Sequence, residues 1–396
     1  MSIKYNFGIS GNSSIWVMDC VSGFYYPISV ERLYKIFATK RFMALSYDKS
    51  SNSVKSSTIL GIQKNEHVTT ILKRTRERRF VELGRDAHIG VYNTSDGVTS
   101  RRIVTTRPTG RFFSPRNFDI VQYQPNDTFG YATGCKVVAN VTMNTDLCFR
   151  FGVFSAVVQS MEGHALMLRV HDSLPATFIK EKVYELFKMM GEDIIYTPHH
   201  FGNKKFVSFK CNKELVKVLK EQCSNTIGEY TLPQFILTGS DEMQHAWLEG
   251  FFATKFNKKY TWTHLSKKSQ LYIGLRLLLT KFGIPMKEYL IRSGNIKAFI
   301  FPELAGDVVL ASYIKKEEPG FKQHVRQLKA PNGIMLSSAC NMTIPKTDMV
   351  TYNIDVADYK NYLTDSLFVI YEDVEGINNV NNKARQFRYN DLYIMP

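Results

Sequence analysis

Cysteine is scarce in this sequence, and its few copies are not paired. The chain has 6 cysteines in 396 residues and no C-x-x-C spacing, so neither a zinc site nor a disulfide framework is indicated. A reducing, intracellular setting fits this composition best. Long apolar runs are also missing from the N-terminal part. Residues 1–19 contain only one basic residue, Lys4, and no long apolar core, which argues against a signal peptide and a transmembrane segment. No membrane partner is expected.

Acidic residues are outnumbered by basic ones. The sequence has 51 Lys and Arg against 36 Asp and Glu, a formal net charge of +15. Because each neutralised phosphate releases condensed counterions, such a chain favours a polyanionic partner, and simple solubility is the plain alternative. The length and the 44% hydrophobic content allow two or three ordinary globular domains.

The same short pattern occurs twice in the chain. In each copy a helix with small residues leads to a strand with a His, a second helix that ends at a Gly, and a Gly-Asn turn. The landmarks are Gly152, His171, Gly191, Gly202 and Asn203 in the first copy and Gly250, His264, Gly283, Gly294 and Asn295 in the second. The matched spacing predicts a duplicated supersecondary unit. On a basic chain, such a unit favours a pseudo-twofold grip on duplex DNA.

Secondary-structure patterns place this repeat between two β-rich stretches. Residues 20–117 read as short strands punctuated by Ser, Asn, Gly and Asp. Residues 176–190 and 268–282 instead carry apolar residues at helical spacing, each followed by a Gly suited to a helix C-terminus. Strand character returns from about residue 345. The predicted fold class is α+β, with each repeat running helix, strand, helix, hairpin.

The leading helix of each repeat carries small residues four apart. These are Gly152 with Ala156 and Gly250 with Thr254. Small residues at this spacing let two helix backbones approach closely, so we expect these four to form an interface between the two helices. An ordinary buried helix is the alternative for either copy taken alone.

These helices resemble a known family. Leu248-Glu-Gly-Phe-Phe-Ala-Thr-Lys255 looks like a degenerate LAGLIDADG motif, and Arg150-Phe-Gly-Val-Phe-Ser-Ala-Val157 resembles the first motif of a two-motif LAGLIDADG homing endonuclease. In that family each helix ends in an acidic residue that holds divalent cations for cleaving DNA. Those positions fall on Val157 and Lys255, which lack the hard oxygen ligands that Mg²⁺ prefers. The resemblance implies no metal cofactor, with Mg²⁺ bound only if cleavage is retained through neighbours such as Glu249 or Glu162.

A second resemblance covers the flanking β-rich stretches. Residues 20–28, 42–48 and 81–88 resemble the opening blocks of an intein (Hint) domain, and residues 351–372 resemble its C-terminal blocks. Inteins nest a homing endonuclease inside a split Hint fold in this same order. The resemblance implies that Cys20 and His88 are residual splicing residues. A small core residue is the favoured alternative for Cys20.

Other splicing positions of that family are replaced. Arg85 stands where the family has Thr, Lys360 where it has His, and Tyr371-Glu372 where it has a terminal His-Asn pair; Asp373 replaces the usual downstream nucleophile. Splicing requires a nucleophile, an assisting His and an Asn whose amide cyclises. The resemblance therefore implies that splicing is lost.

The resemblance also points to the DNA-binding residues, because the family's sheets form a saddle over the duplex. Basic residues near strand ends are expected to contact phosphates and polar residues on the exposed face to read base edges, with a solvated sheet face as the alternative. The candidates are Arg169, His171, Lys204, Lys205, Ser208 and Lys210 in the first repeat and Lys258, Lys259, Thr261, Thr263, Arg292 and Lys297 in the second. A basic run in the β-rich part, Lys73, Arg74, Arg76, Arg78 and Arg79, is expected to form a second phosphate-contacting surface.

The expected organisation is a β-rich Hint-like domain split by a pseudo-twofold LAGLIDADG-like domain in one monomeric chain. The predicted segments are a lead at 1–19, the first Hint-like part at 20–117, a connection at 118–144, the two-repeat domain at 145–325, the second Hint-like part at 326–372 and a tail at 373–396.

The leading functional hypothesis is a free-standing, intein-derived protein that stays with the DNA inside the cell. It is expected to bind double-stranded DNA sequence-specifically, without an obligate protein partner, with splicing lost and DNA cleavage lost or impaired. Two alternatives stay open. One is an active homing endonuclease with unconventional metal ligands, and the other is a Hint protein that cleaves itself before Cys20.

Overall fold

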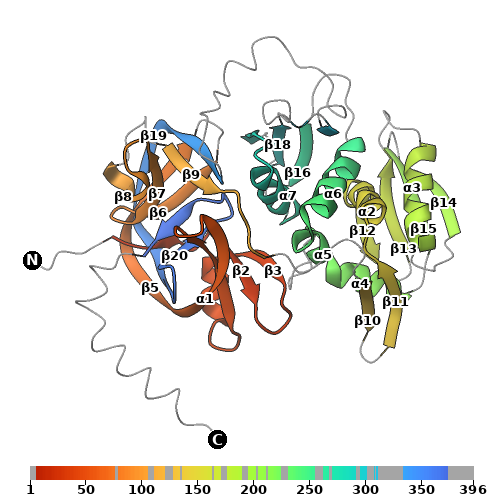
Figure 1. Cartoon of the computed structure of the whole chain (residues 1–396), viewed down its shortest axis with the longest axis horizontal. Coiled ribbons are helices and arrows are strands. Elements are labelled where there is room, and N and C mark those ends of the chain that lie inside the picture. Colours follow the sequence, from red (N-terminus) through yellow and green to blue (C-terminus); the bar gives the residue numbers. More distant parts are fainter. Residues whose placement is uncertain are drawn as a thin grey trace, which may run out of the picture. The chain divides into compact units, whose positions relative to one another are not determined.

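The structure is a computed structural model of the chain (Figure 1). It describes residues 6–75, 79–105, 111–120, 128–133, 136–162, 165–170, 176–189, 195–201, 204–210, 213–223, 231–254, 262–266, 270–290, 295–300, 307, 309–310 and 333–372. No helix among these residues is long and apolar enough to span a membrane.

The chain divides into two compact units. The first consists of residues 1–23, 27–115 and 334–396, and the second of residues 24–26 and 116–333. The first unit is therefore assembled from segments that lie on both sides of the second in the sequence. The overall fold is mixed α and β with a large share of strand, in agreement with the α+β prediction.

The first unit is built on one twelve-stranded sheet, ordered β20-β21-β7-β9-β19-β1-β6-β5-β4-β2-β3, with β8 paired to β7. Its strands before the second unit are β1 (Ile9–Ser10), β2 (Ser14–Asp19), β3 (Tyr25–Ser29), β4 (Phe42–Asp48), β5 (Ser53–Thr75), β6 (Phe80–Gly84), β7 (His88–Asn93), β8 (Gly97–Arg102) and β9 (Arg111–Pro115). The later elements are β19 (Ile334–Val356), β20 (Asn361–Leu363) and β21 (Val369–Tyr371), and the helical pieces are α1 (Val30–Ile36) and the 3-10 turn η1 (Ile103–Thr105).

Two long strands organise this sheet. β5 and β19 each run for 23 residues and pair antiparallel across several register shifts. Such shifts bend and twist strands, which lets the sheet enclose its own apolar face. Phe112 and Phe113 of β9 are fully buried there, Phe112 against Phe368 with 5.4 Å between ring centroids.

A buried amide joins the C-terminal part of this unit to its N-terminal part. The Oδ1 atom of Asn361 accepts the Tyr47 N–H at 2.7 Å, and its Nδ2 donates to the Tyr47 carbonyl at 3.0 Å and to the Tyr359 carbonyl at 2.7 Å. Three satisfied hydrogen bonds at a buried side chain hold β20 in register beside β4.

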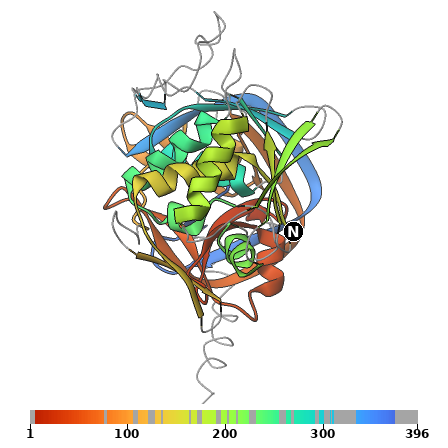
Figure 2. The ribbon, with the colours of Figure 1, turned by 90° about the vertical axis from the view of Figure 1, so that its right-hand side faces the viewer.

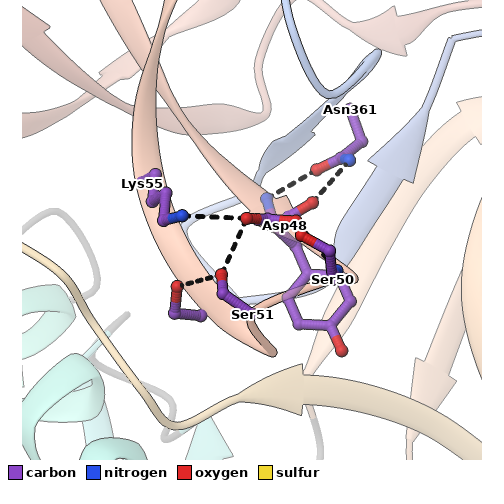
Figure 3. A network of polar contacts seen from close by, with 7 residues as sticks. Asp48, Ser50, Ser51, Lys55 and Asn361 are labelled. Atoms are coloured by element: carbon purple, nitrogen blue, oxygen red, sulfur yellow. Dashed lines mark hydrogen bonds and ion pairs between the residues drawn. The ribbon is translucent and has the colours of Figure 1, made fainter.

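The turn after β4 is closed by an acidic side chain (Figure 3). Asp48 accepts hydrogen bonds from Ser50 Oγ at 2.6 Å, Ser51 Oγ at 2.7 Å and Lys55 Nζ at 2.9 Å. These donors, Ser50 first, lower the pKa of the Asp48 carboxyl below its ordinary value. The carboxylate is fully used inside its own hairpin and is structural.

The second unit contains two copies of the predicted order of elements. The first copy has α2 (Thr145–Val157), β12 (Val158–Glu162), β13 (Ala165–Val170), α3 (Ala176–Met189), β14 (Ile195–Phe201), β15 (Lys204–Lys210) and α4 (Lys213–Gln222). The second copy has α5 (Gln234–Leu237), α6 (Asp241–Ala253), β16 (Trp262–Ser266), α7 (Gln270–Lys281), β17 (Met286–Leu290) and β18 (Asn295–Ile300). The second copy follows the predicted order of helix, strand, helix and hairpin; in the first copy two paired strands, β12 and β13, and not one, separate the helices α2 and α3.

The sheets of the two copies share one strand order. The first is ordered β12-β13-β15-β14 and the second β16-β18-β17, so the strand before the second helix pairs with the last hairpin strand in each. One difference from the prediction precedes them: the expected connection at 118–144 contains a hairpin, β10 (Thr128–Thr133) with β11 (Lys136–Thr142).

Candidate functional site

The helices α2 and α6 of the second unit lie side by side (Figure 2). A Cβ atom added to Gly152 would collide with the Trp247 carbonyl oxygen and lie 2.7 Å from the Phe251 nitrogen. A Cβ added to Gly250 would collide with the backbone of Phe149. Both glycines therefore sit where backbone meets backbone, as a close helix crossing requires.

The other two small residues border this crossing. Ala156 is half-buried, and Thr254 is buried and caps the end of α6, its Oγ1 donating to the Phe251 carbonyl at 2.8 Å. Across the crossing, Trp247 Nε1 donates to Ser155 Oγ at 3.3 Å. The predicted interface therefore packs α2 closely against α6 within the second unit.

The LAGLIDADG resemblance assigned metal-binding positions to Val157 and Lys255. Val157 is the last residue of α2 and is buried, and Lys255 lies outside the described residues. A buried isopropyl group has no atom that can bind a cation. Glu162, one neighbouring acid, is exposed at the end of β12. Within the described part of the chain, no group of three His, Cys, Asp or Glu residues is arranged to hold a metal ion.

The other neighbouring acid, Glu249, belongs to a cluster that the sequence did not reveal. Its Oε1 lies 2.8 Å from His245 Nδ1, and Asp307 Oδ2 lies 2.9 Å from His245 Nε2. The Asp307 Oδ1 also accepts the Leu310 N–H at 2.8 Å. The His245 ring thus fastens the chain at 307–310 to α6, so Glu249 has a structural partner. The one sequence signal for this cluster is the four-residue spacing of His245 and Glu249, which places both on one face of a helix.

Burial and strand register show which rows of the first sheet face its core and which of the predicted DNA contacts lie elsewhere. Leu166, Leu168 and Phe209 are fully buried, whereas Ala165, Lys210 and Ile195, which pair across β13, β15 and β14, are exposed. Because successive residues alternate between faces, Ser208, which is half-buried, and Lys210, which is exposed, share the rows opposite to that of Phe209. Arg169 lies in β13 and Lys204 and Lys205 lie in β15, but their side chains are not described, and His171 lies outside the described residues; these four stay predictions.

Burial identifies the core-facing rows of the second sheet in the same way. Met286, Glu288 and Ile300 are buried, and Thr263 shares the register row of Glu288. Glu288 is held beneath the sheet by Arg276 through hydrogen bonds of 2.8 and 3.0 Å. The side chains of Thr263 and Lys297 are not described, so both residues stay predictions. The remaining candidates, Lys258, Lys259, Thr261 and Arg292, lie outside the described residues.

The basic run of the first unit is largely internal. Lys73 and Arg79 are buried, and Arg79 Nη1 donates to Ser114 Oγ at 3.4 Å. Burial lowers the pKa of the Lys73 ammonium. These two residues are corrected from phosphate contacts to core positions. Arg74 is half-buried, and Arg76 and Arg78 lie outside the described residues.

Cys20 and His88, which the intein resemblance implies to be residual splicing residues, have different surroundings. Cys20 follows β2, is exposed, and donates its backbone N–H to the Arg41 carbonyl at 3.1 Å. The favoured alternative of a core cysteine is therefore wrong. Partial desolvation and then Asp19 raise the pKa of its thiol, which makes the sulfur a poorer nucleophile. His88 instead begins β7, with Arg102 of β8 and Tyr371 of β21 as register partners.

The loop that precedes His88 is hydrogen-bonded to residues 6–8. The Gly84 N–H donates to the Gly8 carbonyl at 2.7 Å, and the Asp86 N–H donates to the Asn6 carbonyl at 2.8 Å. Gly8 has φ of +88°, and a Cβ there would lie 2.7 Å from the Tyr352 carbonyl oxygen. Asn6, Phe7 and Gly8 offer no hydroxyl or thiol, so the chain next to this loop lacks a nucleophile.

Two of the residues that the resemblance places at C-terminal splicing positions, Lys360 and Glu372, do come together. The Glu372 N–H donates to the Lys360 carbonyl at 3.0 Å, and the Glu372 carboxyl accepts the Val356 N–H. Lys360 Nζ pairs with Asp355 Oδ1 at 3.2 Å. Desolvation, with Asp355 adding to it, raises the pKa of the Glu372 carboxyl to about 8. At neutral pH this group is a hydrogen-bonded acid and not a cyclising amide.

No protein-family model and no curated protein matches the chain. Among solved structures it is similar to an intein from a hyperthermophile, with 14% identity over 28% of this chain and 72% of that one and a TM-score of 0.26. The DnaB intein of Synechocystis sp. PCC 6803 follows, with 17% identity over 28% and 70% of the two chains and a TM-score of 0.23.

A third solved structure resembles a larger share of the chain. It is I-DmoI in complex with DNA and Ca, with 10% identity over 41% of this chain and 85% of that one and a TM-score of 0.31. The structural neighbours thus include inteins and a homing endonuclease. Scores of this size carry no argument about function, so the functional proposal depends on the geometry of the chain itself.

Proposed function

We propose that this protein binds double-stranded DNA sequence-specifically, through a LAGLIDADG-like unit inserted in a Hint-like unit, and that it neither splices nor cleaves DNA efficiently. The observation that carries the proposal is the pair of glycine-packed helices, each followed by a sheet that has a basic residue outside its buried rows, the exposed Lys210 in the first and the half-buried Lys287 in the second. Both halves belong to one chain, so a monomer has two half-sites. We infer that it works inside the cell, where the DNA is.

Loss of cleavage is proposed from chemistry at the helix ends. Val157 occupies one of the two positions at which the family places a metal-binding acid, and Lys255 occupies the other. A buried aliphatic group and an ammonium cannot replace two carboxylates as cation ligands. Loss of splicing is proposed from Asn6–Gly8, which offers no nucleophile, and from the Glu372 carboxyl, which is engaged with Val356.

Selection of bound fragments from a random pool of duplex DNA tests the proposal. A single enriched motif of two half-sites is expected, and recovery of no motif would contradict sequence-specific binding. The selected duplex is then incubated with Mg²⁺ or Mn²⁺. Discrete double-strand breaks would support an active homing endonuclease instead. Thiol treatment followed by intact mass tests the self-cleaving alternative, which requires loss of residues 1–19.

A further inference from the structure

One end of the first sheet carries a row of four exposed residues. The strands β12, β13, β15 and β14 are neighbours in that order (Figure 1). Glu162 of β12 pairs with Ala165 of β13, Ala165 pairs with Lys210 of β15, and Lys210 pairs with Ile195 of β14. All four side chains are exposed, and Ile195 is 65% exposed. We call these four residues the terminal row.

The row beside the terminal row faces the core. Met161, Leu166 and Phe209 pair across β12, β13 and β15, and each is at most 8% exposed. Because strand residues alternate between the two faces of a sheet, the terminal row lies on the face opposite to these three. That face is the one that the proposed function assigns to DNA.

The composition of the terminal row does not suit a surface that contacts phosphates alone. Side chains that bind phosphate oxygens are positively charged or donate hydrogen bonds, and neither the Glu162 carboxylate nor the Ile195 side chain does either. Base edges in the major groove accept both kinds of group. A carboxylate accepts a hydrogen bond from the cytosine amino group, and an apolar side chain contacts the methyl group at C5 of thymine.

Ile195 is the member of the row that gains most from such a contact. It is a large apolar side chain in water on β14, an edge strand of its sheet. Edge strands are commonly protected by charged side chains, which Ile195 does not provide. Packing against a methyl group removes apolar surface of both partners from water. The exposed Lys210 ammonium on the neighbouring strand complements a phosphate beside the same base.

We propose that Ile195 determines the specificity of one half-site by contacting the C5-methyl group of a pyrimidine in the major groove, with Lys210 on an adjacent phosphate. The methyl group belongs to thymine or to 5-methylcytosine. This inference rests on the proposed function and names the chemical feature that the first repeat reads.

Modified duplexes test the contact. In the duplex selected from the random pool, each thymine is replaced in turn by deoxyuridine, which lacks only the methyl group. One replacement should weaken binding about 4-fold, the effect of returning one methyl group to water. Each cytosine is likewise replaced by 5-methyldeoxycytidine. A gain of similar size at one position would identify 5-methylcytosine as the source of the methyl group.

Variants of Ile195 connect this preference to the side chain. Ile195→Ala should bind the methylated and unmethylated duplexes equally, whereas Ile195→Val keeps a branched apolar group and should keep the preference. The control is Met189→Ala, which removes an apolar side chain that is 37% exposed on α3 and should leave the preference unchanged. Circular dichroism establishes that each variant is folded, and Ile195→Ser replaces Ile195→Ala if the alanine variant is not.

Two results would overturn the methyl contact alone. One is a selected duplex in which no replacement changes the affinity, and the other is a methyl preference that is equal in Ile195→Ala and the unchanged protein. Recovery of no motif from the random pool would overturn the proposed function as well.

Discussion

At the residue scale, two glycines decide how closely the motif helices approach. Gly152 and Gly250 each face the backbone of the other helix. A side chain added at either position therefore cannot be accommodated by movement of a flexible neighbouring side chain. Crowding at such a position moves a whole helix and everything attached to it. The glycine spacing is therefore a requirement of packing, whatever residue stands at the end of each helix.

Replacing Gly250 by Val should lower the free energy of unfolding by about 3 kcal/mol or more, because the added atoms overpack a backbone contact. Urea unfolding followed by far-ultraviolet circular dichroism measures the change. The matched control is Ala165→Val on an exposed strand position, which should stay within about 0.5 kcal/mol of the unchanged protein. Similar stability of the two variants would contradict the close crossing.

A second single residue, Glu372, makes stability depend on pH. Its pKa is raised from 4.5 to about 8 in the folded protein, so the folded state holds a proton that the unfolded state has released. The stability this group contributes is complete below about pH 4.5 and is lost as pH rises through 8. Glu372→Gln keeps an oxygen for the Val356 N–H and should gain on the order of 3 kcal/mol over the unchanged protein between pH 5 and pH 9.

Unfolding curves collected across that pH range check this expectation. Asp355→Asn is the companion variant. It removes the second carboxyl and should move the pH midpoint lower without abolishing the dependence, because desolvation is the larger cause. A pH dependence that is identical in the Glu372→Gln variant would contradict the assignment to Glu372.

At the scale of single elements, the alternation of strand residues between the two faces of a sheet decides which are buried and which are exposed. Charge alone does not decide this. Phe209 and Lys210 are neighbours in β15, yet Phe209 is fully buried and Lys210 is exposed. Glu288 shows the reverse: a charged residue in a short strand is buried because Arg276 on α7 pairs with it through two hydrogen bonds.

Breaking this pair should be costly. Arg276→Ala leaves the Glu288 carboxylate buried without its guanidinium and should lower the free energy of unfolding by about 3–5 kcal/mol. Replacing both residues by Leu should restore much of the loss, since a well-packed apolar pair often matches a buried ion pair. Thermal and urea unfolding compare the two variants. Equal destabilisation by the single and double changes would show that packing, and not the unpaired charge, dominates.

At the scale of the whole molecule, binding to duplex DNA should depend strongly on salt. The logarithm of the binding constant falls with the logarithm of salt concentration in proportion to the phosphates neutralised. Lys210→Gln, on the outward row of β15, should lower this slope by about one phosphate contact. Lys213→Gln, equally exposed but on α4, is the control and should leave it unchanged. A salt response that is flat in the unchanged protein would contradict DNA binding altogether.

Several features of the fold were predictable because they are local or repeated. Helix periodicity, the glycines four residues before Ala156 and Thr254, and the order helix, strand, helix, hairpin all follow from short-range chemistry. The φ of +71° at Gly283, just after α7, is another such case. The basic run at 73–79 was not predictable in this way. Lys73 is buried because β5 is paired on both sides, with Thr343 of β19 and with Val81 of β6.

The sequence by itself determined the duplicated helices, the excess of basic charge and the absence of acids at Val157 and Lys255, because these depend only on residue identity and spacing. Only the tertiary structure decided which residues face outward, that Asn6–Gly8 and not Cys20 lies beside the loop before His88, and that Glu372 is a buried acid. Those outcomes depend on pairings between segments up to hundreds of residues apart. Short-range patterns carry no information about such pairings, since burial is set by whichever distant strand lies alongside.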